Sequence, residues 1–477
     1  MKTLQTNKYC AHLGVAIILP LLGLGLFYVA SGAQTTTKKP AVTIAKVAPP
    51  SKPVKLQVKP PHPKDEKKIV EPKVKPKTID QHKDQPRKPP ITHLTGGRTV
   101  QMGSDGRIKE LHDPTRGLTI KHGLTGRTRV VSDQGGRRIV AERGGRSFVQ
   151  RPFRYGGRDY AKRRYIYNGR IYDRYYAQSR YHDVDINYYT PVRYYPTAYY
   201  GYSYNRWSTP VPYAWEWAGN SWSQYYGAYF TPAQSYSSPP AWLTDYMLST
   251  TLAAAYQANA NAQALAAPPT DAAPMTPQVK TLITGEVQRQ IALENAEAQS
   301  GAQTEASSSV ERDFTDNVPH IFVAGNDLDV IDNGGSECSI TEGDAFRLIE
   351  PPAAEAKTAK LVVLASKGGY ECKIASVVAV GIDDLQEMQN HMRETIDAGL
   401  EAMRNNKALP TPPASASGPP VNSAFLAAAP PPDPNAATEI NQQLQGSDQA
   451  EKTAMEQLAQ QAQAAQTSAN PPSSPQI

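Results

Sequence analysis

Short β-prone runs alternate with Gly-Arg pairs over residues 95–182. The pairs return every nine to twelve residues, and a reversed pair, Arg116-Gly117, fills one longer gap. Glycine supplies the positive φ that tight hairpin turns require, and Asp105-Gly106 and Asn168-Gly169 are strong turn signals. The pattern predicts an antiparallel β-hairpin meander over 95–182. The runs between the turns are Thr99–Met102, Leu118–Ile120, Thr128–Val131, Arg138–Val140, Ser147–Val149 and Tyr165–Tyr167.

A second set of strand-like runs lies in residues 318–405. Five short apolar runs occur between Ile321 and Val380, and turn signals such as Asp332–Gly335 and Lys367–Gly369 separate them. Five short strands in so short a length predict a small SH3-like β-barrel with a C-terminal helix.

Helical periodicity marks several segments. Asp383 is expected to cap the helix that follows the barrel, with Gln386 as its capping-box partner. Thr276-Pro277 is a typical start for an amphipathic helix over 276–300, because Thr caps a helix and Pro is tolerated in its first turn. The fold class is therefore mainly β with helical segments.

Aromatic residues concentrate in the middle of the chain. Twenty-two of the 26 tyrosines fall between Tyr155 and Tyr246, and all five tryptophans lie in the same third. Frequent Pro and Gly predict short strands and loops packed by aromatic rings in the block 183–265, which ends in a helix from Pro240 to about Ala260.

Other segments are expected to be disordered linkers. Residues 34–94 alternate Pro with Lys, which predicts an extended spacer similar to the Pro-Lys spacer of TonB-type proteins. Residues 406–477 are rich in Pro, Ala and Gln, and predict a disordered tail with one weak helix near 437–465.

Residues 1–33 have the features of a signal peptide or signal anchor. Lys2 and Lys8 precede an apolar run, and Ser31 and Ala33 fit a cleavage site before Gln34. An uncleaved run of about 20 residues is long enough to span a bilayer. We therefore expect export, with a periplasmic or cell-surface location that is anchored if the segment stays uncut.

Two of the three cysteines remain once the first 33 residues are set aside. Cys338 and Cys372 fall in one compact region, which predicts a disulfide in an exported chain. The other interpretation is two buried free thiols.

Charge divides the chain into two halves. Residues 95–182 hold 20 Lys and Arg against 7 Asp and Glu, and residues 35–94 hold 15 against 5. Because the total is only +7, residues from 183 onward are strongly acidic. This asymmetry predicts an anionic partner for the basic half; the alternatives are a solvated, self-repelling chain or halves that attract each other.

Arginines and aromatic rings supply the candidate binding residues. Guanidinium groups pair with phosphates or carboxylates, and aromatic rings stack on sugars or bases. The partner would be peptidoglycan, an acidic polysaccharide or extracellular DNA; the alternative is that the aromatic residues form a core. The candidates are Arg137, Arg138, Arg143, Arg146, Arg163, Arg164, Tyr199, Tyr200, Trp215 and Trp217.

No catalytic signature occurs in the sequence: a Gly-x-Ser-x-Gly elbow, a phosphate-binding loop and a His-Glu-x-x-His helix are all missing. Asp183–Asn187 resembles the opening of a calcium loop, but Tyr188 stands where that loop requires glycine. The sequence predicts a protein that is not an enzyme and that uses no metal or cofactor.

Three features together resemble a group of uncharacterised exported bacterial proteins. They are the Gly/Arg meander, an aromatic block that contains Trp242–Tyr246, and a two-cysteine domain that ends at Asp384–Glu394. The resemblance spans about residues 95–405 and implies layout and compartment. The resulting hypothesis is a non-enzymatic envelope protein that binds an anionic polymer; the alternative is a self-assembling surface protein.

Overall fold

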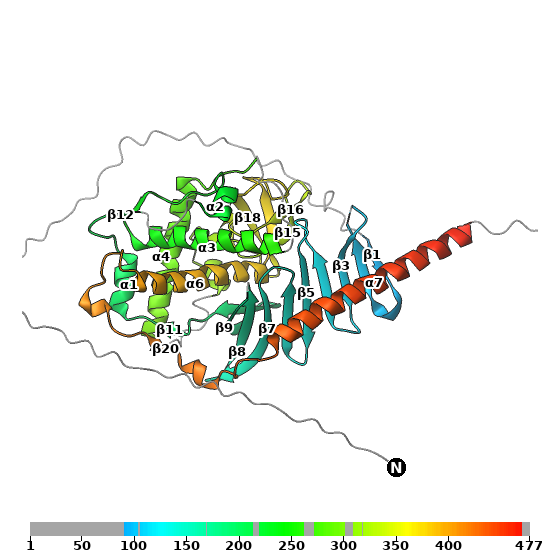
Figure 1. Ribbon diagram of the computed structural model, residues 1–477, viewed down its shortest axis with the longest axis horizontal. Helices are drawn as coiled ribbons and strands as arrows, with labels where there is room; N and C mark the ends of the chain where they lie inside the picture. Colours follow the sequence, from blue (N-terminus) through cyan, green and yellow to red (C-terminus); the bar gives the residue numbers. More distant parts are fainter. Residues whose placement is uncertain are drawn as a thin grey trace, which may run out of the picture. The chain divides into compact units, whose positions relative to one another are not determined.

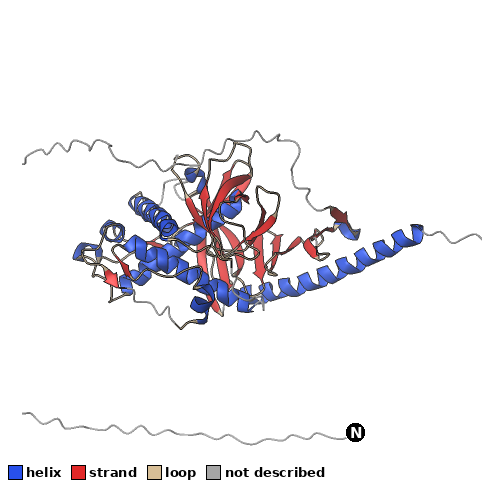
Figure 2. Cartoon of the chain, turned by 90° about the horizontal axis from the view of Figure 1, so that it is seen from above, coloured by secondary structure: helices blue, strands red, loops and turns tan. Residues whose placement is uncertain are grey.

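A computed structural model of the chain describes residues 90–103, 105–167, 169–212, 219–261, 271–300, 309–316 and 318–469. These residues belong to one compact unit, Ile79–Ile477. They form a mainly β structure with seven α-helices (Figures 1 and 2). The predicted signal or anchor at 1–33 lies outside the described residues, as does the spacer up to residue 89.

Residues 91–189 fold as one ten-stranded antiparallel sheet, and each strand pairs with its neighbours in sequence. This confirms the meander predicted for 95–182. The sheet is longer than predicted, because its first strand lies in the predicted disordered spacer and its last in the predicted aromatic block. The turn glycines adopt the left-handed backbone that the pattern requires, with φ of +76° at Gly106 and +82° at Gly126. The strands are β1 (Ile91–His93), β2 (Thr99–Met102), β3 (Ile108–Asp113), β4 (Leu118–His122), β5 (Thr128–Gln134), β6 (Arg137–Glu142), β7 (Ser147–Tyr155), β8 (Arg158–Tyr167), β9 (Arg170–Tyr181) and β10 (Val184–Tyr189).

Side chains alternate between the two faces of the sheet. On one face Val100, Leu111, Ile120 and Val130 stand opposite one another in adjacent strands, and all four are fully buried. The helix α7 (Ala436–Ala469) covers this apolar face, crossing the strands in Figure 1.

The position of α7 corrects the predicted disordered tail. Ala436, Ile440, Ala450 and Ala454 lie on one stripe of the helix and are buried against the sheet. Small residues on this stripe let the helix approach the strands closely. The sequence of the tail by itself indicates only a weak helix. The helix is stabilised by an apolar surface that lies on strands about 300 residues earlier in the chain, which local sequence does not reveal.

The helix α6 (Ile382–Asn405) packs against β10, the last strand of the sheet. Its Asn390 accepts a hydrogen bond from the Tyr189 amide at 2.7 Å and donates to the Asn187 carbonyl at 2.6 Å. Arg393 donates to the Tyr189 carbonyl at 3.1 Å. These side chains pair the backbone of β10, whose edge would otherwise offer free donors and acceptors to another chain.

The predicted SH3-like barrel is wrong for the described residues. A four-stranded antiparallel sheet forms instead, in the order β14-β17-β18-β19, and its outer strands do not pair with each other. The barrel stays open because α6 packs on this sheet and a separate ribbon, β15-β16, docks on the β4-β5 hairpin. The strands are β14 (Ile321–Val323), β15 (Leu328–Ile331), β16 (Glu337–Ile340), β17 (Ala345–Leu348), β18 (Thr358–Ala365) and β19 (Val377–Gly381).

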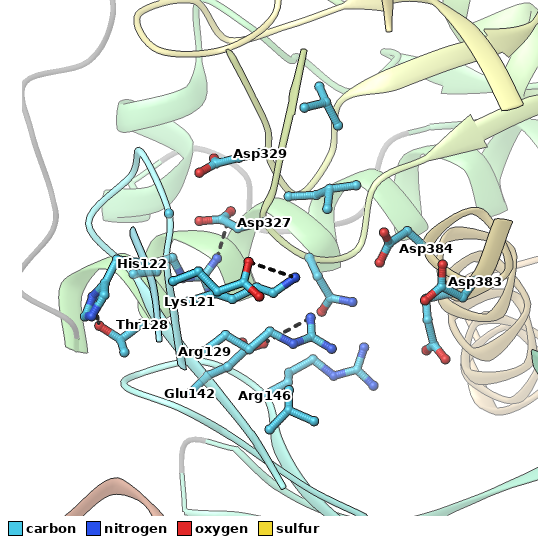
Figure 3. Close-up of a pocket in the computed structure, with 18 of the residues that line it drawn as sticks. Lys121, His122, Thr128, Arg129, Glu142, Arg146, Asp327, Asp329, Asp383 and Asp384 are labelled. Carbon is cyan, nitrogen blue, oxygen red and sulfur yellow. Dashed lines mark hydrogen bonds and ion pairs between the residues drawn. The ribbon is translucent and has the colours of Figure 1, made fainter. Parts of the chain in front are cut away.

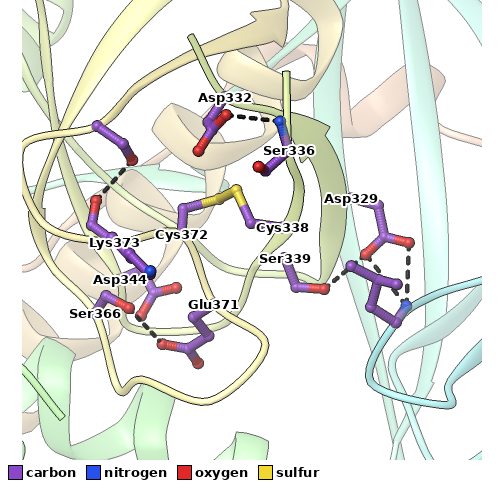
Figure 4. Close-up of a disulfide and its surroundings, with 12 residues drawn as sticks. Asp329, Asp332, Ser336, Cys338, Ser339, Asp344, Ser366, Glu371, Cys372 and Lys373 are labelled. Atoms are coloured by element: carbon purple, nitrogen blue, oxygen red, sulfur yellow. Dashed lines mark hydrogen bonds between the residues drawn. A yellow bond between two sulfur atoms is a disulfide. The ribbon is translucent and has the colours of Figure 1, made fainter. Parts of the chain in front are cut away.

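Cys338 and Cys372 form the predicted disulfide (Figure 4). The bond ties β16 to the loop that follows β18, and the Cys372 amide donates to the Ser339 carbonyl at 3.0 Å. Both cysteines are buried in the core of the C-terminal region.

The aromatic block contains more helix than its Pro and Gly content predicts. Tyr199 and Tyr200 lie on α1 (Thr197–Tyr204), and a second short helix is α2 (Ser221–Tyr226). Both helices pack with α3 (Pro239–Asn261) and α4 (Pro277–Gln299) around one core, so burial of the rings outweighs the weak local preference.

One of the two predicted helix caps is confirmed. The Thr276 side chain accepts from the Val279 amide at 3.2 Å at the start of α4. The predicted capping box at Asp383 is wrong, because Gly381 is the N-cap and makes no side-chain bond. Gln386 instead accepts from the Val310 amide at 2.9 Å and joins α6 to α5 (Val310–Asp313).

Two short strand pairs and three 3₁₀ turns complete the fold. They are β11 (Arg193–Tyr194) with β20 (Val421–Asn422), β12 (Val211–Pro212) with β13 (Ser235–Tyr236), and the turns Thr95–Gly97, Ala414–Ala416 and Ala424–Ala428.

Candidate functional site

A cleft of about 690 Å³ lies on the face of the large sheet opposite α7. One wall consists of residues from β2 to β8 and of β10, and the other consists mainly of β15, the loop before it and the first half of α6. Figure 3 shows the side chains of Arg129 and Arg146 extending from the sheet towards the wall that carries Asp383 and Asp384.

The sheet wall carries a row of charges set by strand register. Glu110, Lys121, Arg129 and Glu142 stand opposite one another across β3 to β6. Their ion pairs are long, 3.8 Å between Lys121 Nζ and Glu110, and 3.5 Å between Arg129 and Glu142. Long, part-exposed pairs contribute little stability, so both cations remain available to a ligand.

The opposite wall carries two carboxylates in the first turn of α6. Among the described residues, Asp383 and Asp384 make no hydrogen bond or ion pair within the chain. Burial in the cleft and the neighbouring charge of Asp383 raise the pKa of Asp384 to about 6, against the opposing effect of Arg129 and Lys121. The two walls therefore present opposite charges to the same space.

Ion pairs across the floor of the cleft join the large sheet to α6 and make this floor rigid. Arg163 is buried and makes two 2.8 Å bonds to Glu387, and Arg146 contacts Glu394 at 2.9 Å. Burial and the adjacent Arg146 lower the pKa of His391 to about 4, so this imidazole is neutral at physiological pH.

A docked hairpin tip forms the rim. Arg127, in the turn between β4 and β5, is buried and contacts Asp327 at 2.9 Å and Glu342 at 2.6 Å. The Leu124 amide donates to Asp329 at 3.1 Å. These contacts fix the distance between the sheet and the C-terminal region, and hence the width of the cleft.

The predicted arginines divide between the two faces of the sheet. Arg138, Arg146 and Arg163 line the cleft. Arg137 contacts Asp433 at 3.0 Å and also Glu439, and Arg143 contacts Asp448, so both face the α7 side. Arg164 contacts Asp173 at 3.2 Å in the neighbouring strand.

The two predicted aromatic platforms that the structure describes are not brought to the cleft. Tyr199 and Tyr200 are fully buried; they donate to the Leu400 carbonyl at 2.6 Å and to Glu294 at 2.7 Å. These two rings belong to the core, the alternative that the sequence left open, and cannot stack on a surface ligand. Trp215 and Trp217 lie outside the described residues.

Sequence reasoning missed the two residues that define the acidic wall. Asp383 and Asp384 precede an amphipathic helix, which is the usual place for capping carboxylates, so their pattern predicts a cap. Lys121 and Arg129 alternate with apolar residues like many exposed strand cations. The unusual density of charged residues on one face of the meander is the signal that could have identified Lys121 and Arg129.

The basic and acidic halves of the chain attract each other within one molecule. Pairs between distant segments occur on both faces of the sheet and at the hairpin tip. These include Arg127–Glu342 at 2.6 Å, Arg137–Asp433 at 3.0 Å, Arg146–Glu394 at 2.9 Å and Arg163–Glu387 at 2.8 Å. Much of the predicted basic surface is thereby neutralised internally.

Comparisons with known proteins found no match, whether with protein-family models, with curated proteins or with solved structures. In the described part of the chain, none of the helices combines the length and the apolar character that crossing a bilayer requires.

Proposed function

We propose that this protein is an extracytoplasmic, non-enzymatic binding protein of the cell envelope, and that its cleft holds a charged segment of a wall polymer. The observation that carries the proposal is the opposition of two walls: Lys121 and Arg129 on the sheet, and the unpaired Asp383 and Asp384 on α6. A ligand with an amine and a carboxylate would pair with both walls at once.

The opposite charges of the two walls favour one of the three polymers that the sequence suggests, which are peptidoglycan, acidic polysaccharide and extracellular DNA. DNA and acidic polysaccharides carry only negative charge, which Asp383 and Asp384 would repel. Peptide-substituted wall glycan carries free amines as well as carboxylates, so its peptide portion matches the cleft. We therefore favour peptidoglycan-like polymers over the purely anionic ones.

Two features support a place outside the cytoplasm. Residues 1–33 have the pattern of a signal or anchor, and the Cys338–Cys372 disulfide fits an oxidising compartment. The Pro-Lys composition of residues 34–94 predicts a spacer that would let the folded part reach a polymer at a distance from the membrane.

The proposal is tested by calorimetric titration of the exported chain with soluble wall fragments whose peptides carry free amines and carboxylates. We expect binding that weakens as salt is raised, because the contacts are ionic and part-exposed. The double variant Asp383→Asn/Asp384→Asn should weaken binding about tenfold, which corresponds to about 1.4 kcal/mol.

A matched control is Asp105→Asn, which removes an exposed carboxylate that pairs with Arg107 at 2.7 Å outside the cleft. It should leave binding unchanged. Equal binding by the double variant and the parent would count against the cleft. Binding of DNA or acidic polysaccharide in preference to the wall fragments would count against the proposed ligand class.

Binding should also depend on pH through Asp384. Since its pKa is raised to about 6, this carboxyl is ionised above that pH and loses its charge below it. Affinity for the wall fragments should fall several-fold from about pH 7.5 to about pH 5, over the range where Asp384 is protonated. Titrations of Asp384→Asn over the same range should show a flatter profile, and an unchanged profile would assign the pH dependence to another group.

A further inference from the structure

A buried lysine lies between two carboxyl groups in the C-terminal sheet. The side chains of Lys367, Asp344 and Glu371 are 6%, 2% and 8% exposed. Asp344 directly precedes β17, and Lys367 follows β18 by two residues, at the end where Ala345 of β17 pairs with Ala365 of β18. The two groups are therefore far apart in sequence but adjacent across neighbouring strands.

The lysine amine contacts both acids. Lys367 Nζ contacts Oδ1 of Asp344 and lies 3.2 Å from Oε1 of Glu371. The other Asp344 oxygen accepts from the Thr341 amide at 2.8 Å. The Asp344 carboxyl is thus held by the backbone with one side turned to the amine.

Glu371 is held just as firmly. It accepts from the Ser366 hydroxyl at 3.0 Å, from the Thr341 hydroxyl and from the Lys367 amide. Figure 4 shows Glu371, Ser366 and Asp344 grouped beside the disulfide. A fixed carboxylate next to an amine is suited to take its proton.

Aromatic rings exclude water from this cluster. Lys367 Nζ lies 4.9 Å from the centre of the Tyr229 ring, and Tyr226 and Tyr229 are both buried. Burial, followed by the nearby charge of Glu371, raises the pKa of Asp344 well above its usual range. Asp344 and Glu371 in turn raise the pKa of Lys367 against the effect of its burial, so the amine loses its proton only to an acceptor held in direct contact with it. A neutral carboxyl is a better acyl acceptor than a carboxylate, because it can release its oxygen as water.

We propose that Lys367 and Asp344 are joined by an isopeptide bond, with Glu371 as the positioned proton acceptor. The ammonium gives a proton to Glu371, and the neutral amine attacks Cγ of the protonated Asp344. A C–N bond forms and a C–O bond breaks. The second amine proton leaves with the Asp344 hydroxyl group as water, and Glu371 keeps the first proton.

This reaction needs no oxidant, reductant or cofactor. The ammonium, the carboxylic acid and the carboxylate on one side balance the amide, one water molecule and the protonated Glu371 on the other. The new bond ties the residue before β17 to the loop after β18, and Lys367 lies five residues before Cys372 in that loop. The C-terminal region would then hold two covalent cross-links in the same loop.

The alternative is that Lys367 and Asp344 form a buried ion pair and no covalent bond. The cross-linked chain and the chain with only an ion pair differ in mass by one water molecule. Intact-mass spectrometry of the folded, exported chain should show a mass one water molecule below that expected for the sequence with its disulfide. Digestion should yield one branched peptide in which the segment containing Lys367 is joined to the segment containing Asp344.

Three variants test whether the water molecule is lost at this site. Lys367→Arg keeps the positive charge and the ion pair but should restore the missing water. Glu371→Gln should slow bond formation about a hundredfold, the usual contribution of a general base, and leave a mixture of the two masses. Lys360→Arg, at an exposed lysine 3.5 Å from Glu350, should keep the parent's mass deficit.

Either of two results would overturn the proposal. The first is a folded parent chain, confirmed by circular dichroism, that retains the full mass of the sequence with its disulfide. The second is a Lys367→Arg variant that still lacks the water molecule, which would place the dehydration elsewhere.

Discussion

Replacing Ala454 by glutamate is expected to detach α7 from the large sheet and to lower the free energy of unfolding by about 3 kcal/mol or more. Ala454 is fully buried within the seam between α7 and the apolar face of the sheet. A glutamate there would bring an unpaired carboxylate into apolar surroundings, and helix propensity offers no compensation because Ala and Glu are both good helix formers.

The neighbouring residue supplies the control. Met455 is 47% exposed on the same helix, so Met455→Glu should change the free energy of unfolding by less than about 0.5 kcal/mol. Urea unfolding followed by circular dichroism measures the difference. Hydrogen exchange should show faster exchange in β3 to β6 for Ala454→Glu only. Equal stability of the two variants would mean that α7 does not stabilise the sheet.

Replacing Arg393 by methionine is expected to lower the free energy of unfolding by about 3–5 kcal/mol, because it leaves buried carboxylates without their counter-charge. Arg393 on α6 is 1% exposed and contacts Glu297 of α4 at 2.8 Å. Nearby Glu294 is also buried, and burial followed by the charge of Asp397 raises its pKa to about 8.

The same substitution in an exposed pair is the matched control. Arg180 is 64% exposed and contacts Asp185 at 3.0 Å, so Arg180→Met should cost less than about 1 kcal/mol. Adding Glu297→Gln to Arg393→Met should recover part of the loss, since it removes one of the stranded charges. If Arg393→Met lowers the free energy of unfolding by less than about 1 kcal/mol, the buried ion pair is not needed for stability.

The effect of Arg393→Met should depend on pH. A carboxyl whose folded pKa is raised favours the folded state below its unfolded pKa, and that contribution is lost as pH rises through the folded value. Arg393 opposes the raised pKa of Glu294, so its removal should make the folded chain less tolerant of alkaline pH. The difference from the parent should therefore be larger near about pH 8.5 than near about pH 5.5.

The features that the sequence predicted correctly depend on short stretches of chain. Gly106 and Gly126 mark turns because a positive φ is a property of one residue, and Thr276 caps α4 through a contact three residues away. The Cys338–Cys372 pair was predictable because only two cysteines remain after the first 33 residues.

The features that the sequence did not predict depend on partners far along the chain. Tyr199 and Tyr200 look like surface aromatics until α4 and α6 enclose them. The strand pattern of 318–405 resembles a barrel, and only the packing of α6 and the docking of β15-β16 on the large sheet keep it open.

The amino-acid sequence by itself determined the hairpin meander, the disulfide and the opposite charge of the two halves, because each follows from residue type, spacing or count. Only the tertiary structure decided that those charges pair within one chain, that α7 covers the apolar face, and that Asp383 and Asp384 stay unpaired opposite Lys121 and Arg129. The reason is that the partner of a charge or an apolar stripe is chosen by distance in space, which local sequence does not specify.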